Sequence, residues 1–363
     1  MKTQIWNQRD LAELFTDSEV AAISVTRIKS RIHPFGALLA QSEPTATQAV
    51  TAQAFRTVLR CDKPWLESNR RRLLDNDYTS ASSVLAEMRA YGALLHSFSE
   101  VKALPPRSSG KTPDFAVKLA GGDTVFVEVH AKQWDTDQAK NLENFMQQPP
   151  AAPPKGSRIA TAEHLSQPFG RPKTVQEAPR NERTIENMVS RIAGIKAGDQ
   201  QIPLGVVSVL WLDFQDETWA GFGLRDHLYP LISWNGAVSS GGFWHAFYGR
   251  KGMPLLEGAD VCIGFLGGAV EMQHEGRFYQ TDKKGGPTRT AGVVISLPEE
   301  SAILENPNAD EKLSEEFVLG ALEFPWFRIE KSWLNWPAKN LTQKIATGIE
   351  SLRGLERGQG RCV

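Results

Sequence analysis

The spacing of apolar positions along the chain predicts which segments are helices and which are strands. Residues 8–75 are predicted to be mainly helical, and residues 79–98 repeat apolar side chains at the three- and four-residue spacing of an amphipathic helix. In residues 115–119 and 124–132 the spacing becomes two, as expected for strands, and the turn AGGD separates them. This region therefore predicts a helix followed by a β-hairpin that packs against it.

The second half of the chain predicts another long helix, a buried strand and several shorter strands. Residues 181–201 predict an amphipathic helix, and residues 203–214 (PLGVVSVLWLDF) are apolar nearly throughout, which indicates a strand buried on both faces. Four further segments predict strands: GGFWHAFYG at 241–249, ADVCIGFLGG at 259–268, GRFYQT at 276–281 and TAGVVISL at 290–297. Residues 311–324 and 340–358 predict C-terminal helices.

Residues 134–180, between the hairpin and the second helix, are rich in proline, glutamine and serine and lack a sustained period. They predict a long surface loop inserted into a domain, because the strand that follows is expected to complete the same sheet. The resulting division is an N-terminal helical region at 1–78, a core at 79–300 that contains the loop, and a mainly helical C-terminal extension at 301–363.

Composition and charge indicate a soluble globular protein. The chain of 363 residues is 41% hydrophobic and 23% charged, and its net charge of −1 creates no global field that would attract nucleic acid or an anionic membrane. Its cysteines, Cys61, Cys262 and Cys362, lie far apart without a CxxC pair, which fits a reducing compartment. The first residues lack an apolar signal-peptide core, and no apolar run is long enough to span a bilayer. We therefore expect a cytoplasmic protein without membrane contact.

One carboxylate falls within the apolar stripe of the helix at 79–98. At about 100° per residue, Glu87 is flanked on the helical wheel by Tyr91 and Leu94, whereas Arg89 falls on the opposite face. A carboxylate in a buried stripe is costly unless a cation, a metal or several donors compensate it. Glu87 is therefore a candidate metal ligand. The alternative is that it snorkels at the edge of the stripe or pairs with a buried arginine.

Two more acidic residues lie on the predicted hairpin. Asp114 follows a proline in GKTPDF, at the entry to the first strand, where the alternative is an ordinary turn aspartate. In TVFVEVHAK (124–132) one face is apolar, and the other carries Phe126, Glu128, His130 and Lys132. A fully solvated face would not be expected to include Phe126. The hairpin also brings Asp114 into the same region of the sheet as Glu128.

Taken together, these elements resemble the PD-(D/E)XK nuclease superfamily. The matching pieces are a helix with an inward glutamate (Glu87 in LAEMRAYGALL), a Pro-Asp pair before a strand (Asp114 in GKTPDF), and a strand with Glu-x-basic (Glu128 in FVEVHAK). The resemblance covers residues 79–215. It implies an α/β fold with an αβββαβ restriction-endonuclease-like core, a mixed sheet flanked by helices, to which this chain adds N-terminal helices and a C-terminal α+β extension.

The resemblance also implies an activity. In that family the acidic residues, here Glu87, Asp114 and Glu128, hold Mg²⁺ (or Mn²⁺), and a lysine assists the attacking water. Carboxylates suit this hard cation, which polarises a phosphate and lowers the pKa of bound water. The expected function is hydrolysis of phosphodiester bonds in nucleic acid, with DNA as the expected substrate.

The sequence departs from the family pattern at the lysine. His130 occupies that position, and Lys132 follows two residues later on the same face. Either could assist catalysis, the role could come from Lys196 or Gln200 on the second helix, or it could be lost. Two alternatives to a nuclease therefore remain: a catalytically inactive binding or assembly subunit with the same scaffold, and an unrelated α/β protein. If the chain is an unrelated α/β protein, Glu87 is expected to be exposed or bound to an arginine.

Overall fold

The computed structural model of the chain falls into two compact units, described here separately. The first, which we call the sheet unit, comprises Met1–Gln133, Ala197–Leu224 and Arg289–Pro337, and the second comprises the remainder. The described residues are 5–28, 31–40, 45–105, 112–132, 192, 195, 205–215, 232–234, 237–239, 242–252, 254–255, 270–272, 274–281, 288–298, 301–324 and 333–335.

A mixed sheet forms the centre of the sheet unit. Within the described residues it has seven strands in the order β13-β12-β11-β6-β5-β4-β3. The strands are β3 (Glu100–Ala103), β4 (Phe115–Lys118), β5 (Thr124–Ala131), β6 (Val207–Asp213), β11 (Thr290–Ser296), β12 (Ser301–Glu305) and β13 (Trp333–Asn335). β3, β4 and β5 form an antiparallel meander, whereas β5, β6 and β11 run parallel to one another. β12 pairs antiparallel with β11 and parallel with β13.

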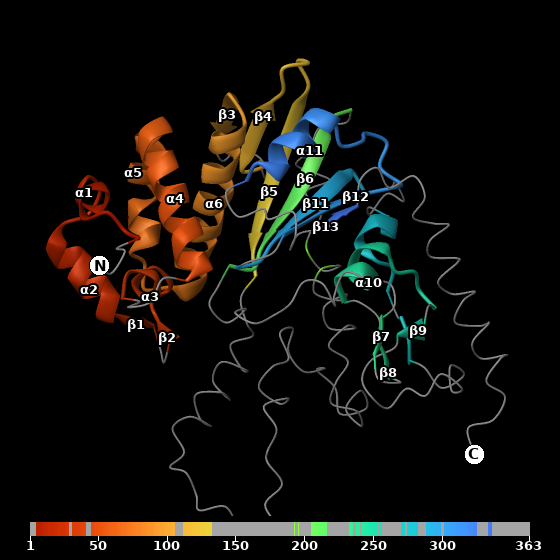
Figure 1. The fold of residues 1–363 in the computed structure, drawn as a ribbon, viewed down its shortest axis with the longest axis horizontal. Coiled ribbons are helices and arrows are strands. Elements are labelled where there is room, and N and C mark those ends of the chain that lie inside the picture. The colour runs from red at the N-terminus through yellow and green to blue at the C-terminus, as the bar shows by residue number, and fades with distance from the viewer. Residues whose placement is uncertain are drawn as a thin grey trace, which may run out of the picture. The chain divides into compact units, whose positions relative to one another are not determined.

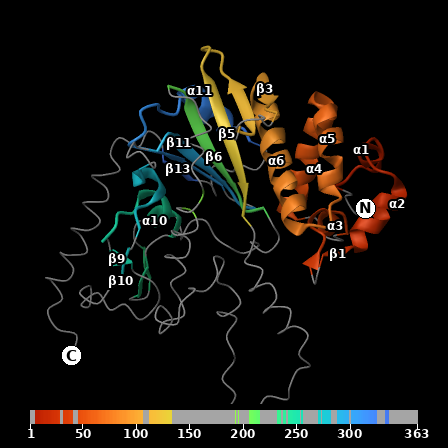
Figure 2. The same ribbon diagram turned by 180° about the vertical axis from the view of Figure 1, so that it is seen from behind.

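The long helix α6 (Tyr78–Ser97) lies between the sheet and the other N-terminal helices. It contacts β5 on one side and α4 (Ala46–Cys61) and α5 (Lys63–Leu73) on the other, as both views of the ribbon show (Figures 1 and 2). The remaining elements before α4 are α1 (Gln8–Ala12), α2 (Asp17–Val25), the short strands β1 (Arg27–Ile28) and β2 (Arg31–Ile32), and α3 (Pro34–Ala40). α6 is therefore buried on nearly every side.

Acidic N-caps fix where the helices nearest the sheet begin. Asp62 accepts a hydrogen bond from the backbone N–H of Trp65 (3.2 Å) at the start of α5, and Pro64 stands at a position where no N–H is needed. At the start of α6, Asp77 accepts from the N–H groups of Thr79 (3.2 Å) and Ser80 (3.3 Å). These caps set the register of both helices and hence the direction in which their polar side chains point.

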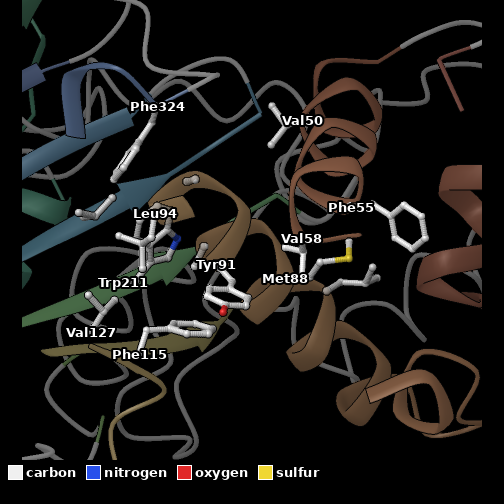
Figure 3. Close-up of a cluster of buried hydrophobic side chains, with 14 of the residues drawn as sticks. Val50, Phe55, Val58, Met88, Tyr91, Leu94, Phe115, Val127, Trp211 and Phe324 are labelled. Carbon is white, nitrogen blue, oxygen red and sulfur yellow. The ribbon is translucent and has the colours of Figure 1, made fainter. Parts of the chain in front are cut away.

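The apolar core continues from α4 through α6 to the sheet (Figure 3). Tyr91 of α6 stacks on Phe115 of β4, with ring centroids 4.7 Å apart. Trp211 of β6 packs on Phe324, which follows α11 (Glu315–Leu322). Burial of each such side chain contributes about 1.5–3 kcal/mol, so the aromatic contacts fasten the helical layer to the sheet.

Glycine permits the closest approach between α4 and α6. A Cβ placed on Gly92 would lie 2.6 Å from the Cα of Ala54. The two helix backbones therefore meet at a point where any larger residue on α6 would push them apart.

The structure confirms the coarse fold class and several predicted elements. The chain is an α/β protein with a mixed sheet flanked by helices. The predicted helix at 79–98 is α6, the hairpin is β4 and β5, and the segments at 203–214, 290–297 and 311–324 contain β6, β11 and α11. β6 is buried on both faces, as its apolar sequence indicates.

Other expectations differ from the structure. The segments at 241–249 and 276–281 were predicted as strands, and this is wrong: they form the helix α10 (Gly242–Tyr248) and a 3₁₀ turn (Arg277–Tyr279) of the second unit. Seven buried residues in a row carry no period, so pattern alone does not separate a strand from a buried helix. β3, β12 and β13 were not foreseen. The helical wheel placed Arg89 opposite the buried stripe of α6 and so predicted an exposed side chain. This is wrong, because Arg89 is only 4% exposed.

The division at 78 and 300 also differs from the observed grouping, because residues 1–78 and the strands β12 and β13 belong to the sheet unit. The predicted loop at 134–180, the strand at 259–268 and the helix at 340–358 lie outside the described residues, as does nearly all of the helix at 181–201. In the second unit the described strands form two small antiparallel pairs, β7 (Ile232–Trp234) with β8 (Ala237–Ser239), and β9 (Pro254–Leu255) with β10 (Val270–Glu271). Among the described residues, no helix combines the length and apolar character needed to cross a membrane.

Candidate functional site

The structure brings the three predicted carboxylates to one pocket of the sheet unit. This pocket has a volume of about 950 Å³ and is lined by α5, α6 and the segments that border β3, β4 and β5. Glu87 reaches it from α6, Asp114 from the start of β4, and Glu128 from β5. We call it the acidic pocket. Three residues separated by up to 41 positions in sequence thus line one pocket.

Asp114 is held where β4 and β5 begin to separate. Its backbone N–H donates to the carbonyl of Val127 (3.0 Å), and its carboxylate Oδ2 accepts from the N–H of Val129 (2.7 Å). The Asp114 side chain thus accepts the hydrogen bond of Val129 on β5 that a backbone carbonyl would otherwise accept. Proline before Asp114 stiffens this entry, because it fixes its own φ and removes a donor.

Asp114 lies in surroundings that oppose its negative charge. Burial and the nearby carboxylate of Glu87 raise the pKa of Asp114 to about 7, although the Val129 N–H and Arg72 act in the opposite direction. The group is therefore divided between its neutral and charged forms near neutral pH. A cation bound beside it would favour the charged form.

Glu87 is bound to an arginine. Arg72 of α5 donates from Nη1 to Oε2 (2.8 Å) and from Nη2 to Oε1 (2.7 Å), a bidentate contact. The Glu87 side chain is 18% exposed and that of Arg72 is 40% exposed. The sequence left this pairing open as an alternative to metal binding, and it is the arrangement that the structure has.

Glu128 lies beside His130 on β5. The imidazole Nε2 and Glu128 Oε1 are 3.7 Å apart, as expected for residues two positions apart on one face of a strand. Both side chains are largely covered, with exposures of 21% for Glu128 and 30% for His130. His130 therefore remains next to the predicted ligand, although it does not line the acidic pocket itself.

The five predicted residues do not form one site. Lys132 lines a different pocket, beyond the end of β5, and none of the described residues lines both this pocket and the acidic pocket. Lys132 is thus placed apart from the three carboxylates, while His130 is not. Lys196 and Gln200, the possible substitutes, lie outside the described residues.

Charge in the acidic pocket favours a cationic ligand. Four carboxylates line it, those of Asp62, Glu87, Asp114 and Glu128, against the single cation of Arg72 among the described residues. Asp62 is already engaged, since it caps α5 and accepts from the hydroxyl of Tyr91 (2.7 Å). The excess of negative charge would repel a phosphate unless a cation were bound first.

These donors suit Mg²⁺ in kind, because it prefers carboxylate oxygens. Their spacing is looser than a closed site requires: no three Asp, Glu, His or Cys side chains in the described part of the chain are gathered closely enough to hold an ion by themselves. Mg²⁺ usually takes only one or two carboxylates and completes its shell with water and substrate phosphate. Asp114 and Glu128 belong to neighbouring paired strands and line the same pocket, so they are the two carboxylates that could hold such an ion.

Arg72 is the functional candidate that the sequence did not single out. It belongs to the basic run SNRRRLLDND (68–77), which the sequence predicts to be a solvated helix end in preference to the alternative, a phosphate contact. Two features of the sequence could have identified Arg72. The buried charge of Glu87 needs a partner, and three consecutive arginines lie on the preceding helix.

No protein-family model, no curated protein and no solved structure matches this chain. What the fold defines is the class of α/β proteins with a mixed, helix-covered sheet, and the site adds an acidic pocket at the junction of two strands. The function is therefore argued from the residues of that site.

Proposed function

We propose that this chain is a metal-dependent nuclease that hydrolyses phosphodiester bonds, with DNA as its substrate. The observation that carries the proposal is the convergence of Glu87, Asp114 and Glu128 on one pocket with a strong excess of negative charge. A pocket of this charge needs a cation, and hard carboxylate oxygens select a hard one such as Mg²⁺ or Mn²⁺.

The order of elements supports the proposal. α6 precedes the meander β3-β4-β5, and β6 then returns parallel to β5. This is compatible with the αβββαβ order that the PD-(D/E)XK resemblance implies, and the carboxylates stand on the elements that the resemblance requires. We therefore include membership of the PD-(D/E)XK superfamily in the proposal.

Each residue of the pocket has a distinct role in the proposal. Asp114 and Glu128 would hold the metal ion, and a bound ion would supply a lowered water pKa and an offset to the charge of the phosphate. Glu87 holds Arg72 at the pocket wall, where its guanidinium can contact a phosphate oxygen that accumulates charge during hydrolysis. Glu87 reaches the metal itself only if this pair opens.

His130 replaces the family lysine in this scheme. Its Nε2 is 3.7 Å from Glu128 Oε1, and we assign it the role of base toward a water bound beside that carboxylate. A neutral imidazole accepts a proton from that water, and the oxygen then attacks phosphorus as the bond to the leaving oxygen breaks.

A second candidate is a catalytically inactive subunit that retains the scaffold for binding or assembly. Two observations favour it: Arg72 occupies both carboxylate oxygens of Glu87, and Lys132 lies in a different pocket. In this case the Arg72–Glu87 pair would be a permanent structural link between α5 and α6.

Incubation of the full chain with plasmid, single-stranded DNA and RNA separates the two candidates. The nuclease cleaves with Mg²⁺ or Mn²⁺ and not with a chelator, and Asp114→Asn and Glu128→Gln each remove cleavage. The matched control is Glu100→Gln, since Glu100 is an exposed carboxylate of the same sheet, paired with Lys118 at 3.2 Å. Absence of cleavage under every condition, or cleavage that survives Glu128→Gln, excludes the enzyme.

A further inference from the structure

One face of α5 forms a wall of the acidic pocket. Trp65, Ser68, Asn69 and Arg72 line it at positions i, i+3, i+4 and i+7, the spacing of neighbouring side chains on a helix surface. Pockets that enclose small organic ligands have volumes of about 300–1,000 Å³, and the acidic pocket has about 950 Å³. It therefore has room for more of a substrate than a metal ion and one phosphate group.

The aromatic surface of this wall belongs to Trp65. Two aromatic residues line the pocket in the described part of the chain, and Phe115 is only 1% exposed, whereas Trp65 is partly exposed. Tyr91 and Phe115 contact the indole with ring centroids 5.3 and 6.3 Å away, at interplanar angles of 57° and 50°. Both rings restrict the orientation of the indole, but neither stacks on its face.

The indole nitrogen of Trp65 is also available to a ligand. A tryptophan N–H usually finds a hydrogen-bond partner when it is buried, and Nε1 of Trp6 donates to the carbonyl of Leu38 at 3.0 Å. Trp65 Nε1 makes no hydrogen bond in the part of the chain that the structure describes. Both the ring and its polar group can therefore contact a molecule in the pocket.

Hydrogen bonds along the helix connect Trp65 to the arginine proposed to contact phosphate. Asn69 Nδ2 donates to the carbonyl of Trp65 (3.0 Å), and Asn69 Oδ1 accepts from Nη1 of Arg72 (3.0 Å). Residues seven positions apart are separated by about 10 Å along a helix axis. The indole and the guanidinium are thus held at a fixed spacing, at which they can contact the same short stretch of a nucleic acid strand.

We propose that Trp65 is a stacking platform for a nucleobase, and that the acidic pocket therefore takes an unpaired DNA strand rather than an intact duplex. Aromatic side chains bind single strands by stacking on base faces, and they do so with little regard to sequence because every base has such a face. In a duplex the neighbouring base pairs cover these faces. A paired base enters a pocket only when it is flipped out, which costs its stacking and pairing.

This inference rests on the proposed nuclease function and adds the form of its substrate. Trp65 contacts a base and not the reacting phosphate, so it stabilises the bound substrate and the transition state equally. Trp65→Leu should therefore raise KM for a single strand and leave kcat unchanged in a cleavage assay. A role in the chemical step would lower kcat instead.

Fluorescence anisotropy measures the coupling between the Trp65 ring and the bases without cleavage. The full chain carries Asp114→Asn, which removes cleavage in the proposed mechanism, and Mn²⁺ is present. The probes are one labelled single-stranded oligonucleotide, the same strand with all its bases removed, and the duplex of the intact strand. We expect the single strand to bind at least about tenfold more tightly than the duplex. Removal of the bases should weaken binding by at least about fivefold.

Adding Trp65→Leu is the decisive step, because loss of packing and loss of stacking predict different results. It should weaken binding of the intact strand by at least about fivefold and leave binding of the base-free strand unchanged. A general loss of stability does not produce this coupling. The matched control is Phe98→Leu, since Phe98 stacks on Phe317 (5.6 Å) and does not line the pocket. This variant also loses a ring contact, but it should retain the DNA binding of the parent chain.

The stacking proposal fails if the single strand does not bind or the duplex binds as tightly. It also fails if Trp65→Leu weakens the intact and base-free strands equally, or if Phe98→Leu weakens binding as much as Trp65→Leu. Metal-dependent cleavage that survives such a result would leave the nuclease function standing. Trp65-dependent binding of the single strand without cleavage under any condition would instead overturn the nuclease function and assign the stacking platform to the inactive binding subunit.

Discussion

Arg72 and Glu87 form a bidentate ion pair between consecutive helices, with nitrogen–oxygen distances of 2.8 and 2.7 Å, at the wall of the acidic pocket. The hydrogen bonds to Glu87 raise the pKa of Arg72 above its ordinary value. Burial lowers this pKa by a smaller amount, and the negative charge of Asp114 raises it further. The Arg72 guanidinium thus interacts with Glu87 and Asp114, two of the carboxylates proposed for the functional site.

Replacing this arginine separates its effect on metal binding from its effect on catalysis. Arg72→Met removes a cation from the acidic pocket, so we expect Mn²⁺ to bind severalfold more tightly because repulsion is reduced. Cleavage should nevertheless fall by at least about tenfold, since one donor to the phosphate is lost. Calorimetry and a cleavage assay measure the two quantities. Arg71→Met, at an exposed neighbouring position, is the control, and unchanged cleavage in Arg72→Met would contradict the role assigned to Arg72.

The raised pKa of Asp114 predicts how metal affinity depends on pH. A proton and a metal ion compete for this carboxylate, whose pKa is about 7 in the folded chain. Affinity for Mg²⁺ should rise by about tenfold per pH unit below pH 7 and level off above it. Titrations at several pH values measure this slope. Asp114→Asn should bind more weakly and show a flatter profile, and an equally steep profile in that variant would show that another group is responsible.

The same group affects the stability of the metal-free chain in the opposite direction from a typical carboxylate. Its folded pKa of about 7 exceeds the ordinary value of 3.8, so the folded state retains a proton that the unfolded state has lost. Its contribution is therefore most favourable below pH 3.8 and declines as pH rises towards 7. Asp114→Asn should accordingly be more stable than the parent at pH 8 in the presence of chelator, as measured by urea unfolding. A less stable variant would show that the hydrogen bond from Val129 outweighs the burial of charge.

Arg89 and Asp213 connect the central helix to the sheet across the core. Their side chains are 5% and 2% exposed, and the Asp213 backbone carbonyl also accepts from the N–H of Lys132 (2.8 Å). Arg89→Met leaves a buried carboxylate without its partner and should lower the free energy of unfolding by about 3–5 kcal/mol. The double variant Arg89→Met/Asp213→Leu should recover most of this loss. Additive losses in the double variant would refute the coupling, and Lys118→Gln at an exposed pair should change stability by less than about 1 kcal/mol.

His33 makes the start of α3 sensitive to acid. Its Nδ1 accepts from the N–H groups of Phe35 (3.2 Å) and Gly36 (3.4 Å), while Nε2 contacts the carbonyl of Asp75 (2.9 Å). Protonation of Nδ1 would abolish the cap, and burial lowers the pKa of His33 from its ordinary value of 6.5. The unfolded chain therefore takes up a proton first, so stability present above pH 6.5 is lost as pH falls below it.

Unfolding between pH 7 and 5 tests this cap. His33→Asn supplies an uncharged acceptor, so the variant should lose the part of the pH dependence that lies in this window, whatever its stability at pH 7. His96→Asn, on the exposed side of α6, should retain the dependence of the parent chain. A profile for His33→Asn that matches the parent would assign the acid sensitivity to another group.

The contact of α6 with α4 predicts an unusual effect of a glycine-to-alanine change. Alanine favours a helix interior by about 1 kcal/mol, yet at Gly92 its Cβ would lie 2.6 Å from the Ala54 Cα. We expect Gly92→Ala to destabilise the chain by about 1–3 kcal/mol. Gly121→Ala, where nothing lies within 4 Å, should change stability by less than about 0.5 kcal/mol. Chemical denaturation measures both, and a stabilised Gly92→Ala would show that the helices move apart at little cost.

Much of the fold around the site could be predicted from periodicity and turns. The alternation in residues 124–132 and the turn before it place Asp114 and Glu128 on adjacent strands, and the helical spacing places Glu87 on the side facing them. These are local patterns, set by the geometry of single elements. Together with the resemblance to the PD-(D/E)XK superfamily, they led to the expectation that the three carboxylates line one site.

Partners between distant segments could not be predicted in the same way. The wheel of α6 describes one buried stripe, but α4, α5 and the sheet surround this helix, so Arg89 is buried as well and pairs with an aspartate 124 positions away. Consecutive buried residues in α10 gave no period to read. Short strands such as β3 and β13 are defined by their neighbours in the sheet rather than by their own sequence.

For this protein, then, sequence alone predicted the α/β class and the central helix and hairpin, and the family resemblance added the expectation that Glu87, Asp114 and Glu128 line one site. Tertiary structure alone decided that Arg72 binds Glu87 and that Lys132 lines a second pocket together with Arg31 and Ser82. The reason is physical: the periodicity of one element sets the face on which a side chain lies, whereas the charge it meets depends on which distant elements pack against that face.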